Sequence, residues 1–289
     1  MMQLRAIVLV PLALLLSVPL VLAQTVAVLA RSPLAKRIPM WVNRLLLLAM
    51  GVRVHLRGEL AERRPLILVA NHVSWLDIPV LGAIAPVRFV SKAEVARWPI
   101  IGWMAKLMRT VFIERGNHGT VGQKAAEVAE ALREGDLVVI FPEGTTSDGN
   151  RVMFFKSGLL GAAREALGDE PLHVQPLSIV HTHGSGLPLG RARRHHAAYP
   201  GTVSLGESLG RVLGEGALDV AVDWGETVAY EPRERRKLFA ARLEAQVRAM
   251  FGARLSDARS PAGTRGALSP ISRAAPPATL GEGAIGAAE

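Results

Sequence analysis

Short apolar runs alternate with longer amphipathic stretches through most of the chain. Runs such as 66–70 and 137–141 consist of large aliphatic side chains bounded by turn-forming residues, which predicts buried strands. Stretches such as 121–133 and 157–167 predict helices. The alternation predicts an α/β fold, a mixed sheet covered by helices. The predicted strands are 52–56, 66–70, 88–90, 111–113, 137–141, 174–180 and 217–222, and the predicted helices are 78–85, 99–108, 121–133, 157–167 and 232–251.

The two ends of the chain differ in composition from its middle. Residues 6–30 are almost entirely apolar and long enough to cross a bilayer. Residues 256–289 are mainly Ala, Gly, Pro and Ser, a composition that cannot bury enough apolar surface to fold. We therefore expect an N-terminal transmembrane anchor and interfacial helix (1–50), a folded domain (51–255) and a disordered tail (256–289).

A histidine and an aspartate lie five positions apart where the strand at 66–70 must break into a turn. On a regular helix five residues rotate the side chain by roughly 140°, so His72 and Asp77 can meet only if the turn folds the carboxylate back. The carboxylate would fix the imidazole tautomer and leave the second ring nitrogen to accept a proton, which makes His72 a candidate general base. Alternatively, Asp77 caps the next helix and His72 is an ordinary strand-end residue.

Three further segments place polar side chains at strand ends, where open α/β sheets bind ligands: 110–115, 137–145 and 173–179. Together with the first motif they resemble the glycerolipid acyltransferase family, typified by 1-acylglycerol-3-phosphate acyltransferases. Arg109 stands where that family usually has glycine, and Phe154 replaces a proline. The matching positions are Asn71, His72, Asp77, Phe112, Ile113, Glu114, Arg115, Phe141, Pro142, Glu143, Gly144, Thr145, Lys156, Val174, Pro176, Ser178 and Ile179.

The resemblance implies acyl transfer from acyl-CoA or acyl carrier protein, as co-substrate, to the hydroxyl of a membrane lysolipid, with no metal or other cofactor. The expected acceptor is 1-acylglycerol 3-phosphate, which gives phosphatidate in phospholipid synthesis. Residues 143–151 also resemble members that acylate lyso-ornithine lipid, which is the alternative acceptor. Outside this chemistry, the chain could be a non-catalytic membrane lipid-binding protein or a lipid hydrolase. The intact His72 and Asp77 argue against the first, and thioester-dependent product formation would exclude the second.

The same resemblance implies roles for the other motif residues. Arg115 offers a planar donor fork suited to phosphate, or it pairs with a neighbouring glutamate. Glu143 is expected to bind an acceptor oxygen or to orient Arg115, because a carboxylate repels phosphate. Backbone N–H groups in the His72 turn are candidates for stabilising the oxyanion. The expected substrate-binding residues are Arg115, Glu143, Gly144, Thr145 and Lys156, with His72 and Asp77 catalytic.

Positive charges flank the apolar segment, with Arg5 before it and Arg31, Lys36, Arg37 and Arg44 after it. This bias places the folded domain on the cytoplasmic face of the inner membrane. The sequence at 21–23 also suits a cleavable secretory signal, but acyl thioesters are cytoplasmic, so we expect a retained anchor. Residues 38–50 suit either an interfacial helix or a helix packed on the core of the domain.

The net charge of +9 indicates an anionic partner. Aromatic residues make up only 5% of the chain and the arginines are dispersed, which favours anionic lipid and disfavours nucleic acid. The absence of cysteine excludes disulfides and thiol nucleophiles. His181, His183, His195 and His196 could in principle bind a metal, but the surrounding glycines, proline and arginines predict a solvated loop that contacts head group or donor.

Overall fold

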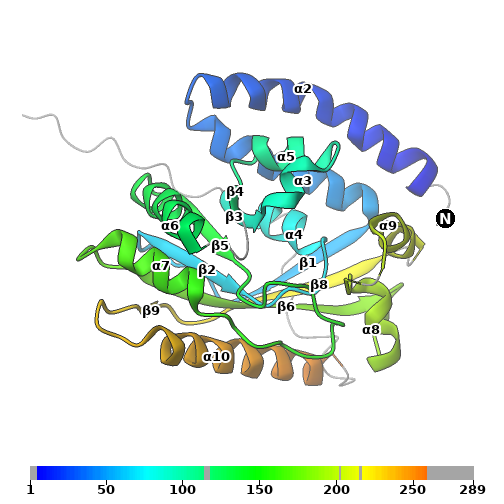
Figure 1. Ribbon diagram of the computed structural model, residues 1–289. Helices are drawn as coiled ribbons and strands as arrows, with labels where there is room; N and C mark the ends of the chain where they lie inside the picture. The colour runs from blue at the N-terminus through cyan, green and yellow to red at the C-terminus, as the bar shows by residue number, and fades with distance from the viewer. Residues whose placement is uncertain (1–4, 114–117, 202, 215–216, 259–289) are drawn as a thin grey trace, which may run out of the picture.

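The computed structural model describes residues 5–113, 118–201, 203–214 and 217–258. The strands are β1 (Val52–Arg57), β2 (Leu66–Ala70), β3 (Val87–Lys92), β4 (Val111–Ile113), β5 (Leu137–Ile140), β6 (His173–Gly184), β7 (Leu187–Pro188), β8 (Leu218–Trp224) and β9 (Val228–Ala229). The helices are η1 (Arg5–Leu9), α2 (Val10–Leu29), α3 (Leu34–Met50), α4 (Asp77–Ile84), η2 (Ala93–Arg97), α5 (Ile101–Leu107), α6 (His118–Arg133), α7 (Gly158–Leu167), α8 (Arg191–Ala197), α9 (Leu205–Gly214) and α10 (Arg236–Asp257). Figure 1 shows the strands joined in one sheet with helices around it.

The sheet is mixed, as the sequence predicts. Seven strands follow one another in the order β1-β8-β6-β2-β5-β3-β4, while β7 and β9 pair with β6. From β6 to β4 all neighbours are parallel, whereas β8 runs antiparallel to β6. All five residues of β2 are buried, because a central parallel strand is covered on both faces. The carboxyl ends of β2, β3, β4, β5 and β6 therefore meet at one edge of the sheet.

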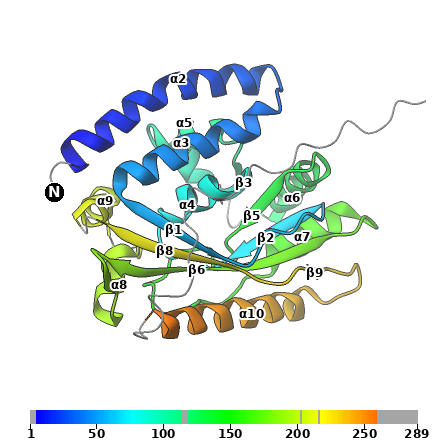
Figure 2. The same ribbon diagram turned by 180° about the vertical axis from the view of Figure 1, so that it is seen from behind.

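Helices cover both faces of the sheet (Figures 1 and 2). On one face, α6, α7 and α10 bury residues such as Val128 and Leu243 in one apolar cluster. On the other face, α3 and α4 bury residues such as Leu47 and Leu81 in a second cluster. The sheet is thus the middle of three layers, and α2 lies outside the layer that contains α3 (Figure 2).

The N-terminal helix α2 lies alongside α3 and buries small or polar side chains, namely Ala13, Ser17, Gln24 and Ala27. Its other side chains are mainly apolar and exposed. Among the described residues, Ile7–Leu29 is the one helical segment long and apolar enough to cross a membrane. Of the residues in its most apolar 18-residue stretch, 17% are buried. Small residues allow close packing against α3, while the outer apolar face lacks a partner within the described part of the chain.

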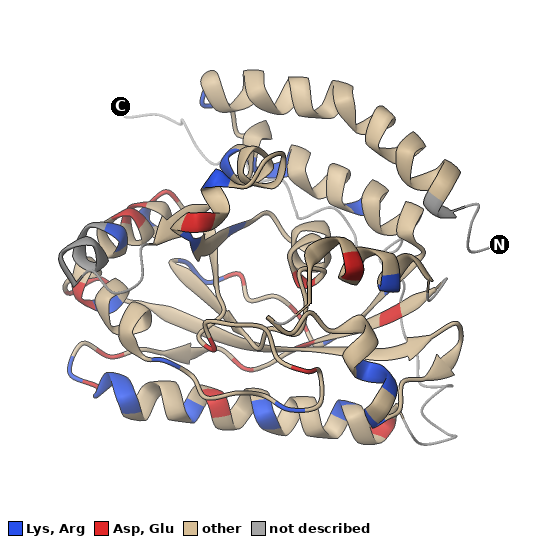
Figure 3. Ribbon diagram, turned by 45° about the vertical axis from the view of Figure 1, so that its right-hand side comes forward, with Lys and Arg blue, Asp and Glu red and all other residues tan. Residues whose placement is uncertain are grey.

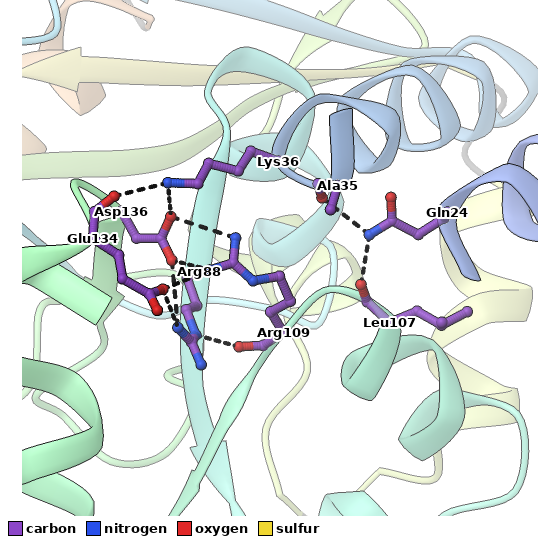
Figure 4. Close-up of polar contacts among 8 residues, drawn as sticks. All are labelled: Gln24, Ala35, Lys36, Arg88, Leu107, Arg109, Glu134 and Asp136. Carbon is purple, nitrogen blue, oxygen red and sulfur yellow. Dashed lines mark hydrogen bonds and ion pairs between the residues drawn. The ribbon is translucent and has the colours of Figure 1, made fainter. Parts of the chain in front are cut away.

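A polar side chain in α2 fixes this helix to the rest of the protein. Gln24 Nε2 donates hydrogen bonds to the carbonyl oxygens of Ala35, 3.0 Å away, and Leu107, 2.7 Å away (Figure 4). Ala35 belongs to α3 and Leu107 is the last residue of α5. The apolar helix is therefore bonded to two other elements of the fold.

The structure decides between the two interpretations of residues 38–50. These residues form the greater part of α3, which begins four residues earlier than predicted. Leu47 and Met50 are buried in the core, so the helix packs on the domain. Trp41 and Leu48 are nevertheless 47% and 76% exposed, so α3 also presents an apolar stripe to the outside.

The prediction of a solvated loop around His181 and His183 is wrong. β6 continues through Gly184 because its antiparallel pairing with β8 extends as far as Leu218. His195 and His196 lie on a separate helix, α8. At the other end of the chain, the predicted helix 232–251 begins at residue 236 and continues to residue 257. It thereby enters the predicted tail, whose remainder from residue 259 lies outside the described part of the structure.

One carboxylate is surrounded by basic side chains from three parts of the fold. Charged residues are frequent on α6 and α10, whereas α2 carries none (Figure 3). The side chain of Asp136, just before β5, is only 2% exposed and forms ion pairs with Lys36 at 2.7 Å, Arg88 at 3.4 Å and Arg109 (Figure 4). Glu134 pairs with Arg109 at 3.2 Å but is 50% exposed. Asp136 therefore joins α3, β3 and the loop entering β4.

We expect Asp136→Ala to lower the free energy of unfolding by about 3 to 5 kcal/mol, because it leaves a partly buried group of cations without their shared carboxylate. The measurement is chemical unfolding of the detergent-solubilised protein. Glu134→Ala is the matched control, since it removes a carboxylate from the same cluster at an exposed position and should cost less than about 1 kcal/mol. If both variants lost the same free energy of unfolding, the burial of Asp136 would not explain its contribution to stability.

Candidate active site

The turn after β2 is held in place by an asparagine. Asn71 is fully buried; its Nδ2 donates to the carbonyl oxygen of Ile179 at 2.9 Å, and its Oδ1 accepts from the Ile179 amide at 2.8 Å. Ile179 lies in β6, the parallel neighbour of β2. Two hydrogen bonds from one side chain thus continue the strand pairing one residue beyond the end of β2.

The turn brings His72 and Asp77 together, as the sequence predicts. His72 Nδ1 lies 2.8 Å from Asp77 Oδ2. The same oxygen accepts hydrogen bonds from the backbone amides of Val73 at 2.7 Å and Ser74 at 2.9 Å. Asp77 is the first residue of α4, so the carboxylate folds back over the turn that precedes its own helix. Because Nδ1 is occupied, Nε2 is the ring nitrogen left to accept a proton from a substrate.

The Asp77 carboxylate is 0% exposed. Burial by itself would raise the pKa of this carboxyl, but hydrogen bonds from His181 and His72, and the charge that those imidazoles can carry, hold the pKa well below its ordinary range. Asp77 is therefore ionised at neutral pH. An ionised partner fixes the tautomer of His72 and stabilises the imidazolium that forms when the base takes a proton.

Aromatic packing fixes the plane of the His72 ring. The ring stacks on Phe141 with centroids 4.1 Å apart and an angle of 17° between the planes. Phe141 directly follows β5, the other parallel neighbour of β2. The His72 side chain is still 18% exposed. The imidazole is thus held by a carboxylate at one edge and an aromatic ring at one face, and part of the side chain reaches the surface.

The Glu143 side chain accepts hydrogen bonds from two backbone segments. Its Oε2 accepts from the His72 amide at 3.2 Å and its Oε1 from the Met153 amide at 2.9 Å. The side chain therefore joins the loop after β5 to the catalytic turn, and its oxygens are already engaged by backbone donors. Burial raises the pKa of Glu143 to about 7, against the lowering effect of these two hydrogen bonds.

The same hydrogen bonds change the assignment of the oxyanion donors. The candidates were backbone N–H groups in the His72 turn, and three amides of this turn, those of His72, Val73 and Ser74, each donate to a carboxylate of Glu143 or Asp77. An amide that already donates to a carboxylate is not available for an oxyanion. These three groups therefore support the turn and do not form an oxyanion hole in this conformation.

The remaining predicted binding residues lie near the loop of Glu143. Gly144 has φ +72°, a conformation that glycine adopts without strain, and Thr145 is exposed beside it. The Lys156 amide donates to the carbonyl oxygen of Pro142 at 3.0 Å, which holds its segment against this loop, and the Lys156 side chain is exposed. Glu114 and Arg115 lie outside the described residues, so the predicted role of Arg115 stays a prediction.

Sequence reasoning missed one residue of the site. His181 Nε2 lies 3.3 Å from Asp77 Oδ1, and the residue is 2% exposed. The apolar run at 174–180 carried the signal, because extending its alternation by one step places His181 on the same strand face as Leu177 and Ile179. Within the described part of the chain, no group of three or more His, Asp and Glu side chains is arranged to hold a metal ion.

Comparison with known proteins places this geometry in a family. A family model described as acyltransferase matches residues 51–180. The chain is 45% identical over 242 residues to a lyso-ornithine lipid O-acyltransferase of Rhizobium meliloti (strain 1021), a match covering 83% of this chain and 82% of that protein. It is 38% identical over 111 residues to a 1-acyl-sn-glycerol-3-phosphate acyltransferase of Neisseria gonorrhoeae, covering 38% of this chain and 44% of that protein.

A solved structure shows the same fold. The crystal structure of the 1-acyl-sn-glycerophosphate acyltransferase PlsC from Thermotoga maritima matches with a TM-score of 0.53 and 22% sequence identity, over 75% of this chain and 78% of that one. The mixed sheet, the motifs at its edge and the extended similarity to a curated relative agree, and the chain is an enzyme that belongs to the acyltransferase family.

Proposed function

We propose that this enzyme transfers an acyl group from acyl-CoA or acyl carrier protein to the hydroxyl of lyso-ornithine lipid, with His72 as general base. The observation that carries the chemistry is the contact between His72 Nδ1 and the buried, ionised Asp77, which leaves Nε2 outside this contact in a side chain that is 18% exposed. A lipid hydroxyl needs such a base, because it is a weak nucleophile when protonated.

The proposed reaction has two proton transfers. His72 Nε2 takes the hydroxyl proton of the acceptor as the oxygen attacks the thioester carbonyl carbon. The tetrahedral intermediate then collapses, the C–S bond breaks, and the imidazolium returns the proton to the leaving thiolate. The products are the acylated lipid and the free thiol carrier. Asp77 keeps its negative charge throughout and stabilises the imidazolium between the two transfers.

The choice of acceptor rests on the extent of the similarities. The lyso-ornithine lipid O-acyltransferase of Rhizobium meliloti matches 83% of the chain, whereas the glycerophosphate enzyme of Neisseria gonorrhoeae matches 38%. The segment 143–151 agrees with the first class. We therefore place lyso-ornithine lipid first and 1-acylglycerol 3-phosphate second, the reverse of the order suggested by the motifs alone.

We further propose that the enzyme is held at the cytoplasmic face of the inner membrane by α2 with help from the η2–α5 segment. Trp98, Ile100 and Trp103 are 41%, 74% and 51% exposed there, and α5 contacts α2. Tryptophans favour the membrane interface. Among the positive charges that support this orientation, Lys36 pairs with Asp136 and Arg44 donates to a carbonyl oxygen, while Arg31 and Arg37 are exposed.

The direct test is mass spectrometry of the products formed by the purified enzyme. Offered acyl donor and both lysolipids, it should acylate lyso-ornithine lipid in preference to 1-acylglycerol 3-phosphate. His72→Ala should lower the turnover by roughly a hundredfold or more while the protein stays folded, because the base is lost. Preference for the phosphate lipid would reject the acceptor, and near-normal turnover of His72→Ala would reject the mechanism.

Glu143 gives a prediction on pH. Its pKa rises from 4.5 in the unfolded chain to about 7 in the fold, so its contribution to stability is full below about pH 4.5 and is lost as the pH rises through 7. The melting temperature of the wild type should therefore fall more steeply between about pH 4.5 and about pH 7.5 than that of Glu143→Gln, which cannot ionise. If the melting temperatures of the two proteins changed with pH in the same way, Glu143 would not titrate in this pH range.

The proposed membrane contact predicts fluorescence quenching by brominated lipids. In vesicles, the double variant Trp98→Phe/Trp103→Phe should lose more of the quenchable emission than Trp75→Phe/Trp224→Phe, since bromine quenches only tryptophans near the acyl chains. The control pair is suitable because Trp75 bonds Ser208 inside the fold and Trp224 packs against the core. Equal loss in both double variants would rule out a lipid contact by the η2–α5 segment.

A further inference from the structure

A second histidine approaches the carboxylate of Asp77. His181 is near the end of β6, on the strand face that carries Leu177 and Ile179 into the core cluster beneath α4. Its side chain is 1% exposed, and its Nε2 lies 3.3 Å from Asp77 Oδ1. His72 binds the other oxygen, Oδ2, at 2.8 Å. One buried carboxylate thus lies between two imidazoles, one from the turn after β2 and the other from β6.

The two oxygens of Asp77 are supported unequally. Oδ2 receives hydrogen bonds from the His72 ring and from the amides of Val73 and Ser74. Among the described residues, the hydrogen bond to Oδ1 comes from His181. A carboxylate oxygen buried without a donor is costly, so the loss of His181 would favour rotation of the carboxylate towards other donors. Rotation would move Oδ2 away from its position beside His72.

The surroundings of His181 indicate which ring nitrogen carries the proton. Nε2 must carry hydrogen to donate to Oδ1. Nδ1 is buried and has no hydrogen-bond partner among the described residues, so a doubly protonated ring would bury an unpaired N–H group. The neutral tautomer with hydrogen on Nε2 fits these contacts. In that form His181 supports the carboxylate and leaves its full negative charge to act on His72.

We propose that His181 is a positioning residue for the acyl transfer: it holds the Asp77 carboxylate in the rotation that presents Oδ2 to His72. The proposal rests on the catalytic roles proposed for His72 and Asp77. His181 touches neither acceptor nor donor in this mechanism, so its removal should affect the rate of the chemical step and not the binding of either substrate. It should also change how tightly His72 holds its proton.

Two amide variants of similar polarity test the proposal. In His181→Gln the side-chain NH2 can occupy the place of Nε2 and reach Oδ1, whereas in His181→Asn the shorter amide stops short of it. We expect His181→Asn to lower kcat by about 10-fold to 100-fold with both KM values within about twofold of the wild type, because the base is misoriented. His181→Gln should recover most of this loss.

The pH profile of kcat/KM provides a second readout. When Oδ1 lacks its donor, the carboxylate rotates and its contact with the His72 ring weakens, so the acid limb of the profile should move to lower pH in His181→Asn and return in His181→Gln. A merely structural role would lower the amount of folded enzyme without moving this limb. His183→Gln, two residues along the same strand and outside the site, is the control and should behave as the wild type.

The outcomes separate this proposal from the proposed function. An inactive wild type on all lysolipids would reject the function itself. An active wild type with a normal kcat and pH profile in His181→Asn would overturn the role of His181 alone. The same conclusion would follow if His181→Gln and His181→Asn lost kcat equally while both melted at the wild-type temperature, because reach to Oδ1 would then be irrelevant.

Discussion

The candidate active site depends on the hydrogen bonds that surround the buried, ionised carboxylate of Asp77. An ionised carboxylate without solvent contact is stable only when hydrogen-bond donors surround it. Asp77 obtains these donors from the turn after β2, from His72 and from β6. The turn cannot open without leaving the charge unsatisfied. The interactions that stabilise the local fold are therefore the same ones that orient the imidazole proposed as the base.

Two other polar side chains extend this arrangement to the neighbouring strands. Asn71 joins the end of β2 to β6, and Glu143 joins the loop after β5 to the backbone of His72. The three adjacent strands β5, β2 and β6 are consequently connected around the imidazole of His72. By contrast, the side chains of Thr145 and Lys156 at the rim are exposed. The proposed base is thus fixed by contacts within the protein, whereas the residues proposed to bind substrate are exposed to solvent.

The sequence predicted the elements whose pattern is local and missed those decided by tertiary pairing. β2 and β4 have the predicted bounds, because β2 is an apolar run between Pro65 and Asn71 and β4 is one between Thr110 and Glu114. The contact of His72 with Asp77 was also predictable, since only a turn allows that spacing to close. His181 was misassigned because Gly184 and nearby turn-forming residues suggested a loop, and the partner that extends β6, strand β8, lies about 40 residues further along the chain. The hydrogen bonds of Glu143 could not be inferred, because they join segments on different strands.

Arg109 takes part in the contacts that join the N-terminal helices to the sheet. It has φ +59°, a conformation that suits the glycine of the motif that this segment resembles, and its guanidinium binds the carboxylate that also binds Lys36 at the start of α3. Gln24 adds a direct bond from α2 to the end of α5. Gln24 thus fixes α2 to α3 and α5, and the ion pairs of Asp136 fix α3 to the sheet. Under the membrane attachment proposed above, the distance of His72 from the lipid surface is therefore set by these hydrogen bonds and ion pairs, and not by a flexible linker.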